Sequence, residues 1–585
     1  MSFDLVLQYL ISPAFFHGAV TTLLITLYSL VFGVAVGVII ALLQDSNTRV
    51  GRTVALVYLW LFRGTPVLFQ IIFIYNVLPT FGIRLTAMVS AVLALSLNEG
   101  AYMAEIIRSG MQAVKKGQRT AALALGILGS DEAVPALLAL AADDADGRDL
   151  VSRGEVPRRT RSFAVYALGL VARQTSTPEI RSQVYTKLAS TLSSDSSATR
   201  DLAVACVQAL GLFQVDAIQS DTGASLTGQL ELLLGYLARE DVHTLVRSHV
   251  PTALARTYGA RSDELGEPWR ERLLDAVLDL AETRSVDKHL LRGAVLALGQ
   301  LADRDSDPID QRTRDFLKDD LFTHTDPQAR RFGLIAMGQI AGRDGDDDAG
   351  LDALKSELLK HMVRGKSGLR EWAAVSLGIF GHVSPEDFGD ELTTALHMSI
   401  EDQRGPKVGA YAVAAGLTGK EELVEPLMDK LERIKDADAR GYMCLALGMI
   451  GEPGAVTVLE DVVKDSTYRA GLLRQAAIGL GMVGGRDSAE LLIDTMVEKD
   501  ALTVQAAIAG ALGIVGDRRS LEPLVSVLQD SQRPELARGL AAAAIGNICD
   551  ARMLPWNEPL ARDINYRSAT DTLTSSDGKG ILDIL

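Results

Sequence analysis

The sequence predicts an all-α protein in which a short N-terminal segment of three membrane-spanning helices precedes a right-handed α–α superhelix. Three observations predict this fold. Residues 1–118 hold 7 Lys/Arg and 4 Asp/Glu, whereas residues 119–585 hold 51 and 70, so a weakly basic part precedes a strongly acidic one. The first part contains long uncharged apolar runs. The second part repeats a short phrase ending in glycine every 32 to 48 residues, which is typical of stacked repeats.

Composition excludes several classes of protein. The 48% hydrophobic content is too high for sustained disorder, and three cysteines cannot staple 585 residues as a disulfide framework. The net charge of −19 on residues 119–585 repels phosphates, so we expect no nucleic-acid partner. The chain has no P-loop and no arguable serine–histidine or cysteine–histidine arrangement, so we expect no enzyme and no cofactor.

Three spans are expected in the N-terminal part. The first is the almost wholly apolar run 19–43, long enough to cross about 30 Å of hydrocarbon as a helix. No positive region precedes it, so it is not a signal peptide. The second covers about residues 54–78 and is interrupted by Arg63. The third covers about residues 85–104, of which only 85–98 are free of charge.

Charge placement predicts the topology. Arg49 and Arg52 lie between the first two spans, and Arg108, Lys115 and Lys116 follow the third. Because basic residues favour the cytoplasmic side, the N-terminus is expected outside and everything after residue 108 in the cytoplasm.

Two blocks of small and polar residues lie within the apolar part, "FRGTPVLFQ" and "NEGAYMAEIIRSG". In this order and at this depth they resemble the permease subunit of ABC importers for polar amino acids. The resemblance covers residues 1 to about 126. It implies a multi-pass inner-membrane location, with an ABC ATPase and a second permease chain as partners. The residues that carry the motif are Arg63, Gly64, Thr65, Pro66, Gln70, Asn98, Gly100, Tyr102, Glu105, Arg108 and Gly110.

The ATPase-coupling loop of that family departs from its pattern here. The family loop resembles E-A-A-x3-G-x9-I-x-L-P and is followed by two more spans. In this chain Thr120 replaces the glutamate, residues 136–139 read Ala-Leu-Leu-Ala where I-x-L-P should fall, and no later run of about 18 apolar residues exists. The departure argues against transport by this chain. The remnant of the loop comprises Gly117, Gln118, Ala121, Ala122 and Gly126.

Two smaller features of this part have two readings each. The Gly33-x3-Gly37 pair either seats a partner helix or packs closely within the bundle. The ionisable residues Arg63 and Glu99 either form a pathway or a pair, or lie at the interfaces and snorkel.

The long part repeats an arginine, several small apolar residues and Ala-Leu-Gly, as in "RGAVLALGQLA" at 292. Each copy alternates two amphipathic helical patterns, and stacking buries their faces against the next copy. The pattern resembles HEAT and HEAT-like repeats and covers residues 119–552. The remaining residues 553–585 break the rhythm, and we expect them to cap the open end. The glycines that mark the twelve copies are Gly126, Gly169, Gly211, Gly259, Gly299, Gly338, Gly378, Gly416, Gly448, Gly481, Gly513 and Gly546.

The recurring arginine is expected to hydrogen-bond carbonyls or an acid of the adjacent repeat, with a ligand-binding role as the alternative. The repeat arginines are Arg161, Arg200, Arg292, Arg330, Arg370, Arg440, Arg474 and Arg538.

Other candidate chemistry has simple structural explanations. The acidic stretch 344–350 lacks Gly and Glu at the loop positions that calcium requires, so it reads as a solvated turn. The histidines show no metal-ligand spacing, and we expect no metal. Cys206, Cys444 and Cys549 are interpreted as buried small hydrophobes. The basic cluster Arg153, Arg158, Arg159 and Arg161 meets either anionic lipid or only solvent.

The sequence therefore predicts three parts: a partial permease region over 1–118, a solenoid over 119–552 and a cap over 553–585. The expected function is a membrane-tethered scaffold, a fusion or chimera whose solenoid binds a protein on its concave face. The alternative is the permease subunit of a polar amino-acid importer. A bilayer is a partner in either case.

Overall fold

The computed structural model of the protein describes residues 13–45, 49–193, 199–218, 224–283, 285–366, 368–483, 486–499, 501–516 and 518–549. The chain divides into two compact units, Met1–Ala121 and Ala122–Leu585, and the division falls inside one long helix. The described residues are helical or irregular and contain no strand, which confirms the all-α prediction. The predicted cap over 553–585 lies outside the described residues.

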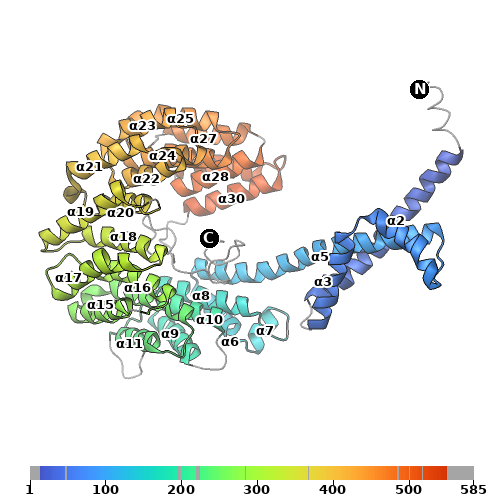
Figure 1. The fold of residues 1–585 in the computed structure, drawn as a ribbon, viewed down its shortest axis with the longest axis horizontal. Coiled ribbons are helices and arrows are strands. Elements are labelled where there is room, and N and C mark those ends of the chain that lie inside the picture. Colours follow the sequence, from blue (N-terminus) through green and yellow to red (C-terminus); the bar gives the residue numbers. More distant parts are fainter. Residues whose placement is uncertain are drawn as a thin grey trace. The chain divides into compact units, whose positions relative to one another are not determined.

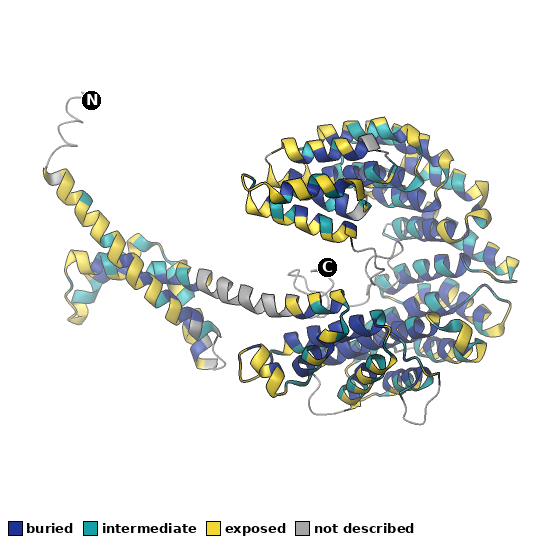
Figure 2. Ribbon diagram, turned by 180° about the vertical axis from the view of Figure 1, so that it is seen from behind, coloured by how far each residue is buried: buried dark blue, intermediate teal, exposed yellow. Residues whose placement is uncertain are grey.

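The N-terminal unit is built from few, long helices: α2 (Pro13–Asp45), α3 (Arg49–Gly64), α4 (Val67–Ile72), the π turn η1 (Phe73–Val77), the 3-10 turn η2 (Leu78–Phe81) and α5 (Ala87–Leu128). Two segments are long and apolar enough to cross a membrane, Phe15–Ala41 in α2 and Ala87–Glu105 in α5. Most of α2 exposes apolar side chains (Figure 2), the surface expected of a helix in lipid.

The second predicted span is not a straight helix. Residues Thr53–Gly64 and Val67–Phe81 are both apolar, but they meet at an angle of 102°. The two form a third span only if the bent pair is counted as one. Hydropathy predicted the apolar run correctly but did not predict the bend. The bend occurs at Pro66, which lacks the N–H needed to continue the hydrogen bonds of α3 and has an extended backbone conformation.

The second unit is a solenoid of paired helices. In each pair we name the first helix A and the second B. The A helices are α6 (Val134–Ala142), α9 (Pro178–Ser193), α11 (Leu226–Ala238), α15 (Glu267–Glu282), α17 (Pro308–Asp315), α19 (Asp348–Arg364), α21 (Pro385–Asp402), α23 (Val424–Arg433), α25 (Val456–Asp465), α27 (Arg486–Glu498) and α29 (Leu521–Gln529). The B helices are α8 (Arg158–Gln174), α10 (Arg200–Leu210), α13 (Val250–Gly259), α16 (Lys288–Leu301), α18 (Pro327–Ala341), α20 (Arg370–Val383), α22 (Val408–Thr418), α24 (Ala437–Ile450), α26 (Ala470–Val483), α28 (Leu502–Val515) and α30 (Glu535–Cys549).

Short helices complete the connections: α7 (Ala145–Leu150), α12 (Thr244–Arg247), α14 (Ser262–Leu265), η3 (Asp131–Ala133), η4 (Phe316–Asp320), η5 (Leu321–Thr323), η6 (Gly405–Lys407), η7 (Glu421–Leu423), η8 (Pro453–Ala455) and η9 (Arg518–Ser520). From α15 to α29 the A helices form the outer row of the stack and the B helices the inner row (Figure 1). One continuous apolar core runs from Ala122 to Ile548 and buries most of the B-helix side chains. This core confirms the predicted solenoid, in which each pair is covered by its neighbours.

The recurring glycines bring adjacent B helices into backbone contact. A Cβ atom placed on Gly169 would lie 2.8 Å from Cα of Ala209, and one on Gly378 would lie 2.7 Å from Cα of Ala414. In both cases the neighbour is the alanine two positions before the next marked glycine. In this part of the stack the phrase therefore supplies both halves of a contact, and we call the row of close contacts made by the marked glycines the glycine seam. Any side chain on the glycine would separate the repeats.

The glycine seam changes register at α13. Gly211 packs against Ala253, and a Cβ on Gly259 would meet nothing within 4 Å. The residue that takes the marked position is therefore Ala255, one helical turn before the glycine that the sequence pattern selected. With this correction the intervals become even, 44 residues from Gly211 to Ala255 and 44 from Ala255 to Gly299.

Candidate functional site

The bend between α3 and α4 is held by the side chains of the first permease block. The Thr65 hydroxyl donates to the carbonyl of Leu61 at 2.8 Å. The Gln70 amide Nε2 lies 3.0 Å from the carbonyls of Phe62 and Thr65 and 2.9 Å from Thr65 Oγ1. The last carbonyls of a helix have no hydrogen-bond donor within the helix. The side chains of Thr65 and Gln70 donate hydrogen bonds to these carbonyls at the bend.

The second permease block joins the same bend from α5. The Asn98 side chain donates through Nδ2 to the carbonyl of Phe62 at 3.0 Å, so Asn98 and Gln70 share one acceptor. Tyr58 on α3 donates its hydroxyl to the carbonyl of Leu97 at 2.6 Å. The structure therefore brings Thr65, Gln70 and Asn98 together into one polar cluster, although 28 positions separate Gln70 from Asn98. Gln70 is only 6% exposed, although many apolar side chains of the same unit are exposed.

Arg63 pairs with Glu105, a partner that the sequence reading did not select. Arg63 Nη1 lies 2.5 Å from Glu105 Oε1, and the guanidinium carbon lies 5.5 Å from the centre of the Tyr102 ring. The pairing partner in the sequence analysis was Glu99. Hydropathy found the two charges near membrane depth but could not say which turn of α5 faces α3.

The glycine pair of α2 packs within the unit. A Cβ on Gly33 would lie 2.9 Å from Cβ of Glu99, and one on Gly37 would lie 2.6 Å from Cβ of Met103. From the other side, a Cβ on Gly100 would lie 2.8 Å from Cγ1 of Val36. The Gly33-x3-Gly37 pair therefore seats α5 of the same chain, which favours close packing within the bundle over an external partner helix.

The coupling remnant divides between the two units. Arg108, Gly110, Gly117 and Gln118 lie on α5, in a stretch whose side chains are outside the described residues. Ala121 is exposed, whereas Ala122 is buried in the solenoid core.

Gly126 is the first member of the glycine seam. A Cβ on Gly126 would lie 2.6 Å from Cα of Ala167 in α8. The side chain of Gln174 also donates to the carbonyl of Gly126 at 3.2 Å. The end of α5 therefore serves as the first layer of the solenoid, and α8 covers the face that carries Ala122 and Gly126.

Several repeat arginines donate to the end of the A helix that precedes them. Arg161 Nε lies 3.1 Å from the carbonyl of Ala141 near the end of α6. Arg538 Nε lies 2.8 Å from the carbonyl of Leu528 near the end of α29, and Arg370 Nε lies 2.6 Å from the carbonyl of Gly365, just after α19. A cation at a helix C-terminus satisfies free carbonyls and interacts favourably with the helix dipole.

The sequence analysis missed one arginine of this kind. Arg247 Nε donates to the carbonyl of Leu237 at 2.9 Å, the same arrangement at the end of α11. It stands eight positions before Ala255, as Arg161 stands eight before Gly169. Choosing Gly259 as the marked glycine hid this spacing.

The other repeat arginines vary. Arg292 forms a two-bond ion pair with Asp326 at 2.9 and 2.7 Å. Burial opposes ionisation of Asp326, but the hydrogen bonds from Arg292 and from the Ala329 N–H outweigh it and lower the pKa of that carboxyl. The remaining arginines have weak or no hydrogen bonds within the described residues: Arg330 reaches the Thr325 carbonyl at 3.5 Å, Arg200 lies 3.9 Å from Asp201, the Nε of Arg440 has no acceptor, and Arg474 lies near Gly510.

The acidic stretch 344–350 is tied into the solenoid by its own hydrogen bonds. Asp346 accepts from the N–H and the hydroxyl of Ser306 at 2.7 and 3.2 Å. Asp347 caps α19 through the Gly350 N–H at 2.8 Å and pairs with Arg314 at 2.5 Å. Two of its carboxylates are therefore engaged by protein donors. Among the described residues no cluster of three potential metal ligands occurs.

The three cysteines do not share one environment. Cys206 and Cys444 are fully buried on B helices, and burial raises the pKa of each thiol to about 12. Cys549 ends α30 and is exposed, so its interpretation as a buried hydrophobe was wrong. The described solenoid gives no neighbour to cover it, because α30 is the last described helix of the stack.

Comparisons with known proteins identify the N-terminal module. The family described as "Binding-protein-dependent transport system inner membrane component" matches residues 33–128. The chain is 41% identical over 134 residues to the arginine transport system permease protein ArgU of Corynebacterium glutamicum, covering 20% of this chain and 42% of that protein. It is 40% identical over 116 residues to the arginine transport system permease protein ArtQ of Bacillus subtilis, covering 20% and 53%. The chain spans about half the length of the curated relatives it matches.

The second module matches repeat families. "HEAT repeats" matches residues 469–546, and "PBS lyase HEAT-like repeat" matches residues 118–143. A crystal structure of importin beta covers 88% of this chain and 77% of its own at 13% identity, with a TM-score of 0.37. The family matches and the stacked helix pairs show that the protein combines a permease-like N-terminal module with a HEAT-repeat solenoid, and both resemblances seen in the sequence are confirmed. The two family matches overlap over residues 118–128, within α5.

Proposed function

We propose that this protein is a membrane-tethered scaffold, in which the permease-like helices anchor a HEAT-repeat solenoid that binds another protein on its concave face. The observation that carries the proposal is the packing of Gly126 against Ala167. The segment that matches both families is built into the first layer of the solenoid. In this proposal residues 1–118 are the anchor, 119–552 the solenoid and 553–585 the cap of a chimeric chain, natural or engineered.

The same packing argues against coupling to an ATPase. An ATPase that docked on the face of Ala122 and Gly126 would have to displace α8, whose residues Phe163 to Ala172 are all buried. Removing α8 would expose apolar side chains and cost about 25 cal/mol per Å² of that surface. The glutamate expected at position 120 is also replaced by threonine.

The alternative is a permease subunit of a polar amino-acid importer, working with an ABC ATPase and a second permease chain. It is favoured by one observation: the polar cluster of Thr65, Gln70 and Asn98 is fully assembled around the bend. A module that served only as a membrane anchor would not require this polar cluster, whereas a module that transports a polar substrate could use it.

The proposed location is the inner membrane, and the proposed role is binding without catalysis. Basic residues at 49, 52, 115 and 116 favour an inner-membrane protein with a cytoplasmic solenoid. The bilayer is then one partner and an unidentified protein the other, without nucleic acid, metal or cofactor. The protein is non-enzymatic in this proposal, because both modules resemble families that work by binding and conduction.

Two experiments test the proposal. In sealed right-side-out vesicles, added protease should leave the solenoid intact, and its digestion would refute the topology. In a strain that lacks its own amino-acid permease, the chain should restore no ATP-dependent uptake, and the detergent-solubilised chain should retain no importer ATPase. Restored uptake, or stoichiometric retention of the ATPase, would establish the transporter instead.

A further inference from the structure

Neighbouring A helices of the outer row are commonly tied together by charged side chains. Between α11 and α15, Arg272 pairs with Glu231 at 2.5 and 2.8 Å. Between α15 and α17, Arg312 reaches Asp279 at 2.7 Å and Glu282 at 2.5 Å. Between α21 and α23, Lys430 donates to the carbonyl of Glu401 at 2.6 Å. These contacts do not close every gap, because a hollow of about 480 Å³ remains between α21 and α23, and one of about 860 Å³ lies between α6 and α9.

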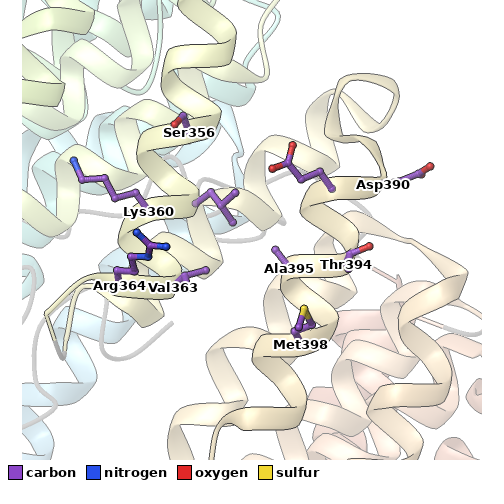
Figure 3. Close-up of a pocket in the computed structure, with 10 residues that line it drawn as sticks. Ser356, Lys360, Val363, Arg364, Asp390, Thr394, Ala395 and Met398 are labelled. Carbon is purple, nitrogen blue, oxygen red and sulfur yellow. The ribbon is translucent and has the colours of Figure 1, made fainter.

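The space between α19 and α21 is different. Among the described residues no hydrogen bond or ion pair joins these two helices, and a groove of about 690 Å³ lies between them. Its lining includes Leu359 and Val363 from α19 and Ala395 and Met398 from α21. Val363 is 48% exposed and Met398 is 60% exposed, high values for large apolar side chains in the outer row. Figure 3 shows Val363, Ala395 and Met398 between the two helices.

A break in α21 lies at one end of this groove. Gly389 has φ 68° and ψ 167°, non-helical values that favour glycine, and separates the first turn of α21 from the rest. The first turn is fixed on both sides of the chain: Phe388 is buried, and Asp387 pairs with Arg304 at 3.0 Å. The turn is therefore anchored to the core, and the helix that follows Gly389 leaves it in a new direction. The groove is a built feature of the fold.

The charges of the groove are separated along its length. Asp390 and Glu391 come eight and seven positions before Met398 on α21, so they lie toward the end of the groove marked by Ser356, and Arg364 lies toward the other end. The Asp390 side chain points away from the groove (Figure 3), which leaves Glu391 as the acid of that end. No hydrogen bond or ion pair engages these three charged residues within the described chain. Lys360, by contrast, is held by Glu357 of its own helix at 2.9 Å. One acidic end, one basic end and an apolar middle thus face outward together.

We propose that this groove binds an amphipathic α-helix of a protein partner, running antiparallel to α19 and α21. The helix places an acidic residue beside Arg364, apolar residues three and four positions later against the apolar lining of the groove, and a basic residue seven positions after the acid beside Glu391. The spacing follows from the groove, because residues 391 and 398 are seven positions apart on α21, or about 10 Å of helix.

Charge complementarity fixes the direction of this partner helix. Its acid lies toward its own N-terminus and its base toward its own C-terminus, the placement that the helix dipole favours. An apolar stripe at three- and four-residue spacing is the usual mode by which a helix enters a groove. The proposal is independent of the concave face, because every lining residue belongs to the outer A helices.

The test uses the full chain in lipid nanodiscs and a fluorescent helical peptide of about four turns. The peptide carries a glutamate as the acid, leucines three and four positions later as the apolar residues, and an arginine seven positions after the glutamate as the base. A second peptide has the acid and the base exchanged. We expect the first peptide to bind at least tenfold more tightly than the second. Val363→Asp should weaken binding of the first peptide at least tenfold, because it places a charge in the apolar middle. Val525→Asp, on the outer helix α29, is the matched control and should leave binding unchanged. Empty nanodiscs report binding to lipid alone.

A charge-reversed chain tests the direction of the helix. The double variant Arg364→Glu with Glu391→Arg should prefer the second peptide over the first. Equal binding of both peptides to the unmodified chain, or no change with Val363→Asp, would overturn the proposal. Concentration-dependent self-association that Val363→Asp abolishes would also overturn it, because the occupant would then be a second copy of this chain.

Discussion

Gly378 and Gly259 carry the same signature in the sequence but differ in the structure, so alanine should affect them in opposite directions. A Cβ on Gly378 would lie 2.7 Å from Cα and 2.9 Å from the carbonyl oxygen of Ala414, and a backbone neighbour cannot rotate away. Overpacking of this kind costs about 3 kcal/mol, and alanine in place of glycine returns about 1 kcal/mol of helix propensity. Gly378→Ala should therefore destabilise the α20–α22 layer by about 2 kcal/mol.

Gly259 is the internal control. A Cβ there meets nothing within 4 Å and the residue is exposed, so only the propensity gain remains. Gly259→Ala should stabilise α13 by up to about 1 kcal/mol.

Amide hydrogen exchange measures both effects, because a repeat array opens locally and no single unfolding free energy describes it. We expect exchange in α20 and α22 to accelerate roughly 30-fold in Gly378→Ala, and exchange in α13 to slow by up to about fivefold in Gly259→Ala. Protection of α22 unchanged by Gly378→Ala would show that the B helices are not in backbone contact. A loss of protection in Gly259→Ala would show that the register correction at α13 is wrong.

Three further outcomes are expected. Arg270→Ala should destabilise the α15–α17 layer by about 3–5 kcal/mol, measured by amide hydrogen exchange during a thermal melt. The reason is that Asp310 is fully buried and lies 2.9 Å from Arg270 Nη2, so the substitution leaves it without its counter-charge. Arg272→Ala, at an exposed pair, is the control and should cost less than about 1 kcal/mol. The lowered pKa of Asp326 means that its ionised form contributes stability above the unfolded pKa of about 3.9, and this contribution is lost as pH falls through the folded value. The protection factors of α16 and α18, which remove the intrinsic pH dependence of exchange, should therefore fall below about pH 4 in the unmodified chain. Asp326→Asn should show the lower protection already at pH 7, with a flatter acid profile. A maleimide added to the native chain should modify Cys549 and leave Cys206 and Cys444 unreacted until denaturant is added, since thiolate and access are both needed; rapid labelling of Cys206 would contradict the packing of α10.

The sequence by itself was enough to recognise the two modules. A 25-residue apolar run has no soluble alternative to a long helix in lipid. Glycine and alanine that recur every 32 to 48 residues predict the close stacking of similar helix pairs. Pro135 and Pro426 lie in the first turns of α6 and α23, where proline is tolerated because the N–H groups of that turn have no partner within the helix.

Only the tertiary structure decided which residues meet. Hydropathy found Arg63 and Glu99 as charges near membrane depth, but Arg63 pairs with Glu105, because the partner depends on the rotation of α5 about its axis. The glycine at 259 matched the repeat phrase, yet packing selects Ala255, because contact depends on the facing backbone and alanine is small enough to serve. The open groove between α19 and α21 depends on how two A helices from different repeats lie against each other. Local pattern fixes the period of such a stack, whereas the register and the gaps are set by long-range packing, which no single repeat encodes.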